Sequence, residues 1–216
     1  MGFIFQTNRH LLLQQAAKHA HVVTGRTLDV GCGPTPRYRH LFKNCTEYVK
    51  MDIEAGENVD VVGFAEAIPF PDESFDSIVC TETIQDVFEP VKGISEFARV
   101  LKKGGVLLMT APSISRQSDS HTDNWRFTRH SFRRLAEDAG FSVEIFEQRG
   151  AFWSTRAQLT VSYWIATFNV YGTWYERPFG ILASVYGRFS IWLDRFERGS
   201  TRSAFTNGYL LIGRKS

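Results

Sequence analysis

A glycine-rich turn, LDVGCGPTP at residues 28–36, is the first stretch of the chain whose residue types and spacing suggest chemistry. Gly31 and Gly33 let the backbone turn sharply and approach a ligand without a Cβ in the way. Asp52, about twenty residues further on, stands where an acidic side chain accepts hydrogen bonds from both hydroxyls of a ribose. These residues predict a site for a ligand that contains a nucleoside. The alternative interpretation is a tight turn and a solvated aspartate.

The same turn bears on which ligand is bound. The dinucleotide fingerprint has a third glycine, and here Pro36 takes its place. A pyrophosphate needs close approach along the whole start of the next helix, which three glycines permit. Pro36 suits the first turn of a helix expected to start near Tyr38, but it removes one N–H donor there. That loss matters less for a nucleoside that carries an amino acid, whose ammonium group Asp29 is well placed to meet.

Short apolar runs alternate with amphipathic stretches through the first two-thirds of the chain, which is typical of a parallel sheet with crossover helices. Gly104-Gly105 is expected to stop one helix, and Ser131 and Gly140 are expected to begin and end another. We expect helices over residues 7–21, 91–101 and 131–141, and strands over residues 26–30, 47–52, 59–63, 74–80, 106–112, 141–148 and 207–215.

Four motifs occur in a fixed order: LDVGCGPTP, then MDIE (51–54), AEAIPFPDESFDSIVC (65–80) and EFARVLKKGGVLLMTAP (96–112). Together they resemble the class I S-adenosylmethionine-dependent methyltransferases, most of all the group with the pattern A-E-x-L-P-F-x-D-x-S-F-D. The resemblance covers roughly residues 25–150. It implies a doubly wound α/β fold with a seven-stranded, mostly parallel sheet whose last strand (Tyr209–Gly213) is antiparallel. It also implies a single domain over residues 1–216 and S-adenosylmethionine as cofactor.

By position, the resemblance implies which residues surround the cofactor. The glycine turn would line the methionine moiety, and the end of the second strand would hold the ribose and pack on the adenine. The segment after Gly63 would meet the adenine edge, and the residues just past the fourth strand would border the transferring methyl group. In that order, the implied residues are Asp29, Gly31, Cys32 and Gly33; Asp52 and Ile53; Phe64, Ala65 and Glu66; and Thr81 and Glu82.

Two positions depart from the family pattern. The family usually has aspartate where Phe64 stands, and that side chain accepts a hydrogen bond from the adenine amino group. Phenylalanine cannot accept this bond, so backbone groups must read the adenine while Phe64 covers the ring. The family also frequently has Glu-His where this chain has Gln85-Asp86. If that histidine is a base in relatives, this protein finds its base elsewhere or needs none.

The polar loop SISRQSDSHTDNWRFTRH (113–130) is where we expect the methyl acceptor to bind, because ligands of open α/β sheets lie outside the carboxyl ends of the strands. His121 titrates near neutrality and is a candidate base, with Asp123 as its orienting group or as the base itself. Trp125 and Arg126 are candidates to contact the acceptor. The DNWRFT stretch resembles a D-x-W-R-F-T subgroup linked to glycan or cell-envelope biosynthesis. Turn capping and core packing are the alternatives for these residues.

Aromatic residues make up 14% of the chain and crowd between Phe152 and Phe196. This insertion, about residues 151–200, has no uninterrupted apolar run long enough to predict a membrane span. Two helices of about fifteen residues, broken at residues 177–180, fit its pattern. Four uses stay open: extra core against the sheet, a lid over a hydrophobic or lipid-linked acceptor, peripheral contact with a membrane, and a homodimer interface.

Composition narrows the class of protein. The 216 residues are 43% hydrophobic and 22% charged, which is ordinary globular composition. A net charge of +2 does not argue for nucleic acid as a partner. Three cysteines without metal-like spacing predict no metal site and suggest a reducing compartment. Because the first ten residues lack the pattern of a signal peptide, we expect a cytoplasmic protein, with the inner face of a membrane as an alternative location.

Taken together, the residues predict a methyltransferase that acts on oxygen, in preference to nitrogen, of a small or lipid-linked acceptor. Two rival classes stay open. An NAD(P)-dependent oxidoreductase is disfavoured by the missing third glycine. A protein that binds S-adenosylmethionine without turnover is supported by the departures at Phe64 and Asp86.

Overall fold

The computed structural model describes the chain except residues 1–3, 36–37 and 118–122 and the side chain of Thr201. The chain forms two compact units. Residues 16–112, 119–147 and 209–216 make up the first, here called the sheet unit, and residues 1–15, 113–118 and 148–208 make up the second, the helical unit. The expectation that the whole chain is one domain stays a prediction.

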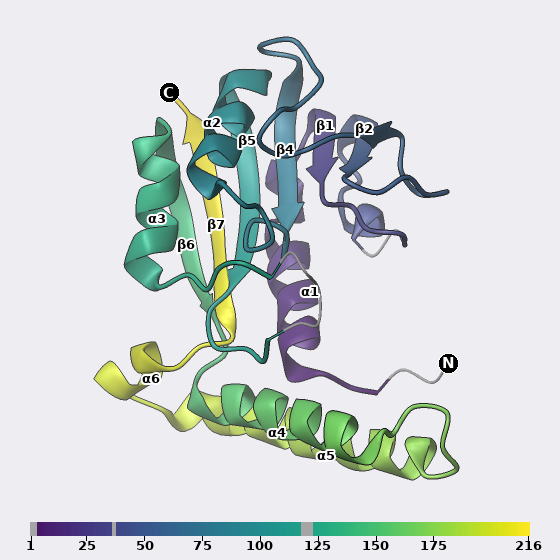
Figure 1. Cartoon of the computed structure of the whole chain (residues 1–216). Coiled ribbons are helices and arrows are strands. Elements are labelled where there is room, and N and C mark those ends of the chain that lie inside the picture. Colours follow the sequence, from purple (N-terminus) through teal and green to yellow (C-terminus); the bar gives the residue numbers. More distant parts are fainter. Residues whose placement is uncertain (1–3, 36–37, 118–122) are drawn as a thin grey trace. The chain divides into compact units, whose positions relative to one another are not determined.

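The sheet unit is built on seven strands in the order β3-β2-β1-β4-β5-β7-β6 (Figure 1). The pairs among β1 to β5 are parallel, whereas β7 is antiparallel and its arrow points opposite to that of β4 in Figure 1. This confirms the predicted α/β fold with an antiparallel last strand. The strands are β1 (Gly25–Val30), β2 (Cys45–Asp52), β3 (Val61–Val62), β4 (Phe75–Thr81), β5 (Leu101–Pro112), β6 (Phe141–Arg149) and β7 (Gly208–Lys215).

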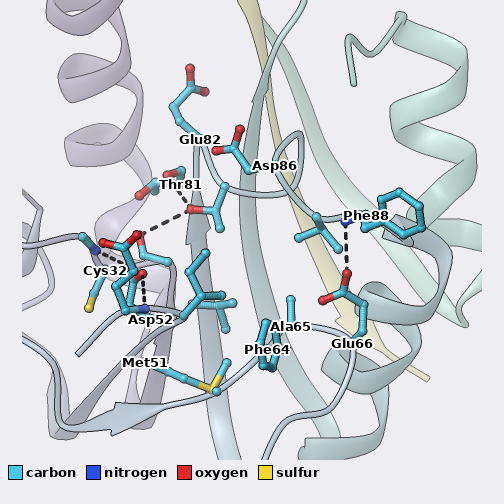
Figure 2. Close-up of a pocket in the computed structure, with 18 of the residues that line it drawn as sticks. Cys32, Met51, Asp52, Phe64, Ala65, Glu66, Thr81, Glu82, Asp86 and Phe88 are labelled. Carbon is cyan, nitrogen blue, oxygen red and sulfur yellow. Dashed lines mark hydrogen bonds between the residues drawn. The ribbon is translucent and has the colours of Figure 1, made fainter. Parts of the chain in front are cut away.

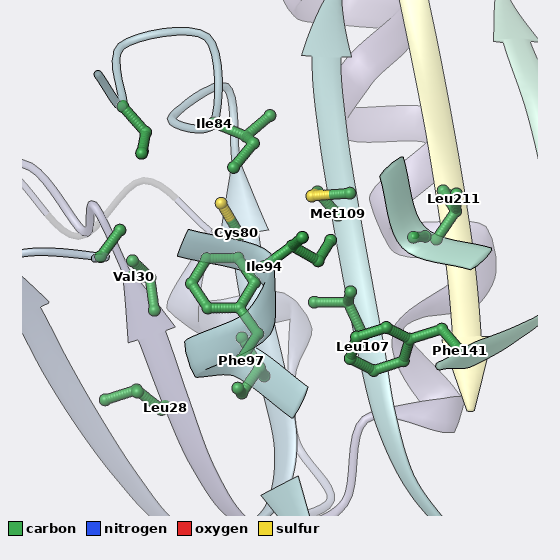
Figure 3. Packing of buried hydrophobic residues seen from close by; sticks show 14 of the residues in the cluster. Leu28, Val30, Cys80, Ile84, Ile94, Phe97, Leu107, Met109, Phe141 and Leu211 are labelled. Carbon is green, nitrogen blue, oxygen red and sulfur yellow. The ribbon is translucent and has the colours of Figure 1, made fainter. Parts of the chain in front are cut away.

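Both faces of the sheet are buried. Successive side chains along a strand point to opposite sides, so neighbouring residues of β4 pack into two different clusters. On one face, Ile78 and Cys80 of β4 pack in a cluster with side chains of α2 (Pro90–Val100) and α3 (Arg129–Asp138) (Figure 3). On the other face, Val79 packs with Val106, Leu108, Ala20 and Phe42. The alternation explains why the central strands read as continuous apolar runs in the sequence.

Two helix boundaries differ from the predicted ones. α2 ends at Val100, and β5 begins directly after it and runs through Gly104-Gly105, so these glycines lie in the strand rather than at a helix stop. α3 begins at Arg129, because Thr128 and Ser131 form a capping box in which each side chain accepts from the other's backbone N–H. Ser131 is therefore the third residue of α3 and not its cap. Gly140 follows α3 as predicted, with φ at +89°.

The helix predicted to start near Tyr38 is wrong for the residues that the structure describes. Only a 3-10 turn, Arg39–Leu41, lies there, and β2 begins soon after at Cys45. The stretch is too short to nucleate a stable α-helix before the next strand. Pro36, on which the argument about a missing donor rests, lies outside the described residues.

The helical unit contains the predicted aromatic insertion. Its helices are α4 (Phe152–Phe168), α5 (Glu176–Leu193) and the short α6 (Ser200–Ala204), with a 3-10 turn at Asp194–Phe196; α1 (Thr7–His19) begins in this unit. The break predicted at residues 177–180 is wrong, since α4 ends at Phe168 and its C-cap, Asn169, takes a left-handed φ of 44°. Pro178 instead lies in the first turn of α5, where its missing N–H needs no partner. None of the helices in the described residues is both long enough and apolar enough to span a bilayer.

Candidate active site

A cavity of about 640 Å³ opens at the carboxyl ends of β1, β2 and β4 in the sheet unit (Figure 2). This is the edge where open α/β sheets bind ligands. Nine of the residues predicted to surround a cofactor line this one cavity, together with Glu82: Gly31, Cys32, Gly33, Asp52, Ile53, Phe64, Ala65, Glu66 and Thr81. The fold therefore gathers residues from three separate motifs of the sequence.

The two glycines of the turn serve different steric purposes. Both take left-handed φ values, +74° at Gly31 and +69° at Gly33. A Cβ on Gly31 would lie 2.2 Å from the side chain of Thr83, whereas a Cβ on Gly33 would meet no protein atom within 4 Å. Gly31 thus permits close packing of the turn on the loop after β4, and Gly33 keeps the cavity open.

We expect Gly31→Ala to destabilise the protein more than Gly33→Ala. Both substitutions carry the left-handed strain of about 1–2 kcal/mol, and only Gly31→Ala adds an overpacking cost of about 1–3 kcal/mol against Thr83. Urea unfolding of the two variants measures the difference. Gly104→Ala is the control for strain alone, because Gly104 has φ at +74° and open space around it. Equal stabilities of all three variants would contradict the steric assignment.

The backbone N–H groups of the turn are already engaged. Those of Gly31 and Cys32 donate to the carbonyl of Met51, at 2.9 and 3.2 Å. The N–H of Gly33 donates to Oδ2 of Asp52 at 2.8 Å. With no α-helix following within the described residues, the turn does not provide the free donors that a bound pyrophosphate uses.

Asp52 is the last residue of β2, and its carboxylate is hydrogen-bonded to the glycine turn. Its Oδ2 accepts from Gly33, and the N–H of Glu54 donates to its Oδ1 at 3.4 Å. A carboxylate oxygen has more than one lone pair, so both oxygens retain capacity for donors in the cavity. A ribose offers two such donors at the right spacing.

Apolar side chains form the walls next to Asp52. Ile53 is 46% exposed and Phe64 is 60% exposed, although both line the cavity. Exposed apolar surfaces of this kind suit a flat aromatic ring. Ala65 is buried, and the carboxylate of Glu66 accepts from the backbone N–H of Phe88 at 3.0 Å, a bond drawn in Figure 2. Glu66 thereby holds the loop that leads into α2.

Asp29 lies on β1 and is buried, and it does not itself line the cavity. Its Oδ2 accepts from the hydroxyl of Tyr48 at 2.9 Å. Burial raises the pKa of Asp29 to about 7, with a smaller contribution from the charge of Asp52. Burial also raises the pKa of the Cys32 thiol to about 12, so Cys32 stays neutral and is not a nucleophile at neutral pH.

The raised pKa of Asp29 predicts a pH-dependent stability. Between about pH 4 and pH 7 the folded state binds a proton that the unfolded state has released, so the free energy of unfolding falls as pH rises. The loss is on the order of 4 kcal/mol. Asp29→Asn keeps an acceptor for Tyr48 and is expected to flatten this part of the profile. Urea unfolding at several pH values measures it, and the exposed Asp60→Asn, which should keep the wild-type slope, is the control.

The residues just past β4 form the far end of the cavity. Glu82 has φ at +53°, a left-handed conformation that a non-glycine residue adopts only when neighbours hold it there. Thr110 does so: its hydroxyl accepts from the N–H of Glu82 and donates to Oε1 of the same residue, both at 3.0 Å. Thr81, the last residue of β4, is buried, and Figure 2 shows Glu82 and Asp86 close to it.

Asp86, on the loop after β4, lines the cavity. Its pKa is raised to about 6, chiefly by burial and then by the negative charge of Asp123; the guanidinium of Arg126 opposes this and the charge of Glu82 adds to it. Gln85 donates to Oδ2 of Asp86 at 3.2 Å. A carboxylate with a pKa near 6 is suited to accept a proton at neutral pH.

The DNWRF segment braces the loop after β4. The N–H groups of Asn124 and Trp125 donate to the carbonyl of Gln85, and the indole N–H of Trp125 donates to the carbonyl of Val87 at 3.0 Å. Arg126 forms a bidentate pair with Asp123, with one bond of 2.7 Å. Asn124 lines the cavity, whereas Asp123, Trp125 and Arg126 do not. His121, the other candidate base, lies outside the described residues.

Several lining residues were not predicted from the sequence: Tyr38, Thr83, Val87, Phe88 and Asn124. Most of them follow β4 in one loop. The rule that ligands bind beyond the carboxyl ends of strands identifies that loop, but it does not say which of its side chains point into the cavity.

Comparison with known proteins identifies the family. The methyltransferase domain family matches residues 28–109, which contain the glycine turn, Asp52 and the loop after β4. The chain carries a class I S-adenosylmethionine-dependent methyltransferase domain. This confirms the predicted family, and the family implies S-adenosylmethionine as methyl donor. The D-x-W-R-F-T subgroup stays a prediction.

Two relatives show how far the similarity of this methyltransferase domain extends. A phosphatidylethanolamine N-methyltransferase of Cereibacter sphaeroides is 32% identical over 111 residues, which are 44% of this chain and 55% of the relative. A ubiquinone/menaquinone biosynthesis C-methyltransferase of Escherichia fergusonii is 30% identical over 136 residues, 45% of this chain and 54% of the relative. The chain thus spans about half the length of the curated relatives that it matches.

Solved structures share the fold of this methyltransferase domain. The 4+2 cyclase SpnF is 19% identical, with a TM-score of 0.63, over 94% of this chain and 80% of its own. A SAM-dependent methyltransferase from Archaeoglobus fulgidus is 14% identical, with a TM-score of 0.60, over 96% of this chain and 94% of its own. At such identities the likeness shows the fold alone. Because one of these proteins is a cyclase, the reaction must be argued from the site.

Proposed function

We propose that the protein transfers the methyl group of S-adenosylmethionine to an oxygen, in preference to a nitrogen, of a small or lipid-linked acceptor. The observation that carries the proposal is the single cavity that joins the glycine turn, Asp52 and Asp86. It supplies a place for a nucleoside, an open side at Gly33 and a half-buried carboxylate at the end where an acceptor would enter.

The residues of the cavity fit such a cofactor. Asp52 would accept hydrogen bonds from the ribose hydroxyls, and Ile53 and Phe64 would pack on the adenine. Asp29 does not line the cavity, so it would act on an ammonium group of the ligand only through its charge, and that positive charge would favour the ionised carboxylate. When bound, S-adenosylmethionine supplies an activated methyl group on sulfonium sulfur, and the protein's contribution is alignment, which is worth roughly 7–11 kcal/mol in well-oriented reactions.

Asp86 acts as the general base in this proposal. Its carboxylate takes the proton from the acceptor hydroxyl as the acceptor oxygen forms a bond to the methyl carbon and the carbon–sulfur bond breaks. The electron pair of that bond stays on sulfur, which leaves S-adenosylhomocysteine. Trp125 acts as a positioning residue, because it donates to the carbonyls of Gln85 and Val87 in the loop that carries Asp86. Asp123 and Arg126 pair with each other and act on Asp86 through their charges.

Two relatives support an apolar acceptor. Their names include phosphatidylethanolamine and the quinones ubiquinone and menaquinone. Phe88, 76% exposed at the cavity, offers apolar surface to an acceptor of this kind. We also propose that the protein is located in the cytoplasm, because its three cysteines without metal-like spacing suggest a reducing compartment.

Calorimetric titration with S-adenosylmethionine and with NADH tests the cofactor. Binding of NADH alone would refute the proposal in favour of an oxidoreductase. Incubation with cell extract then tests turnover through the appearance of S-adenosylhomocysteine. Tight cofactor binding without any product in extracts that contain lipids, quinones and glycans would favour a binding protein without catalysis.

A further inference from the structure

The helical hairpin is defined as α4 and α5 with the loop between them (Figure 1). Several of its large apolar side chains are exposed. The buried residues of α5 are small: Ala183, Gly187 and Ser190. Among the exposed residues of α5 are five large apolar ones, all but the last of them more than half exposed: Ile181, Leu182, Val185, Phe189 and Trp192. A core helix has the reverse distribution.

The two sets occupy opposite sides of α5. Residues 183, 187 and 190 follow one another at helical spacing and form one stripe, and residues 181, 185, 189 and 192 form another, about half a turn away. The stripe of residues 183, 187 and 190 packs closely on its neighbours and therefore needs small residues. A Cβ on Gly187, for example, would lie 2.6 Å from the ring of Phe5. In the part of the helical unit that the structure describes, the large stripe, called here the outer stripe, is exposed.

Aromatic residues at the end of α4 and in the loop of the hairpin are exposed as well. Phe168 is 57% exposed, Tyr171 is 42% exposed and Trp174 is 90% exposed. The hydroxyl of Tyr175 donates to the carbonyl of Phe168 at 2.6 Å, which holds this loop in a defined shape. Aromatic side chains with one polar edge are the residues that lie at the level of lipid headgroups.

The charges of this stretch are distributed unequally. Between residues 151 and 204 all basic residues are arginines and all are exposed: Arg156, Arg177, Arg188, Arg195, Arg198 and Arg202. The acidic residues Glu176, Asp194 and Glu197 are not exposed, and each accepts from backbone N–H groups. The outside of the hairpin is therefore cationic.

We propose that the outer stripe and the loop of the hairpin dock on a bilayer surface that contains anionic phospholipid. Exposed arginines beside Trp, Phe, Ile and Leu are the combination by which an amphipathic helix lies in the headgroup region. A second copy of the chain is a poorer occupant, because two such surfaces would bring arginines together without exposed acidic partners. The docking requires neither turnover nor an identified methyl acceptor.

Sedimentation of the full chain with vesicles tests the proposal. We expect binding to vesicles of equal parts phosphatidylcholine and phosphatidylglycerol, weaker binding to phosphatidylcholine alone, and loss of binding at high salt. Val185→Ser is expected to weaken vesicle binding about tenfold. Arg177→Gln and Arg195→Gln are each expected to weaken it about fivefold, and only on anionic vesicles.

Val91→Ser is the matched control, since Val91 is 67% exposed on α2 and Val185 is 64% exposed on α5. Circular dichroism and S-adenosylmethionine binding establish that each variant is folded. Absence of vesicle binding by the wild-type protein would overturn the proposal, as would equal binding by the Val185 and Val91 variants. A vesicle-free dimer that Val185→Ser dissociates would also overturn it and would assign the outer stripe to self-association.

Discussion

Asp86→Asn is expected to lower the turnover of methyl transfer by about 10²–10⁴-fold, the usual contribution of a general base. Asparagine has nearly the same shape and keeps an acceptor for Gln85, so the loop after β4 should stay in place. The affinity for S-adenosylmethionine should be nearly unchanged. Product formation from extract-derived acceptor, with the cofactor saturating, measures the change.

The pH profile distinguishes a base from a structural residue at position 86. The wild-type turnover should rise as the pH passes about 6, where Asp86 loses its proton, and should be level above that value. The groups that face Asp86 and set this midpoint are Asp123, Glu82, Arg126 and Gln85. In Asp86→Asn the rise should disappear.

Glu89→Gln is the matched control, because Glu89 is an exposed carboxylate on the same loop that does not line the cavity. It should retain wild-type turnover and pH profile. If Asp86→Asn kept full turnover with the same rise near pH 6, Asp86 would not be the base, and residues 118–122 would be the next place to look for one.

Asp52→Ala is expected to weaken S-adenosylmethionine binding by between about a hundredfold and ten-thousandfold. Two hydrogen bonds from ribose hydroxyls to a charged acceptor would be lost, each worth about 1.5–3 kcal/mol. Calorimetric titration measures the change. Asp52→Asn retains an acceptor for Gly33 and should bind with intermediate affinity.

The carboxylate of Asp52 also holds the glycine turn, so the stability of the variant must be measured separately. Asp60→Ala is the control, since Asp60 accepts from the backbone N–H of Lys50 beside the same strand but does not line the cavity. Wild-type cofactor affinity in a folded Asp52→Ala variant would mean that the ribose assignment is wrong.

The strands of the sheet and most of the residues that line the cavity around Asp52 could be predicted because they depend on short stretches of sequence. Apolar runs of β4 and β5 are buried on both faces and so read as strands without knowledge of their neighbours. Gly31, Gly33 and Asp52 have residue types that few other roles require. The prediction of a helix near Tyr38 was wrong, because it rested on the local residue pattern alone. Too few residues remain between Tyr38 and the start of β2 for a stable α-helix.

The properties of the candidate base could not be predicted, because they arise between residues far apart in the chain. Asn124 donates to the carbonyl of Asp86 across 38 positions, and the charges of Asp123 and Arg126 reach the Asp86 carboxylate only in the folded state. The pKa of Asp86 follows from this burial and from these neighbours. A sequence shows that position 86 is an aspartate and does not show its environment.

The sequence by itself determined the α/β class, the glycine turn and the aromatic content of the insertion, since each is a matter of residue type and near-neighbour spacing. Tertiary structure alone decided that Asp86 shares a cavity with Asp52 and that α5 buries Ala183, Gly187 and Ser190 while its large residues face outward. When apolar residues lie on all sides of a helix, the sequence pattern does not determine which side faces the core. Which side does so depends on the shape of the surface against which the helix packs, and here that surface admits only small side chains at Gly187.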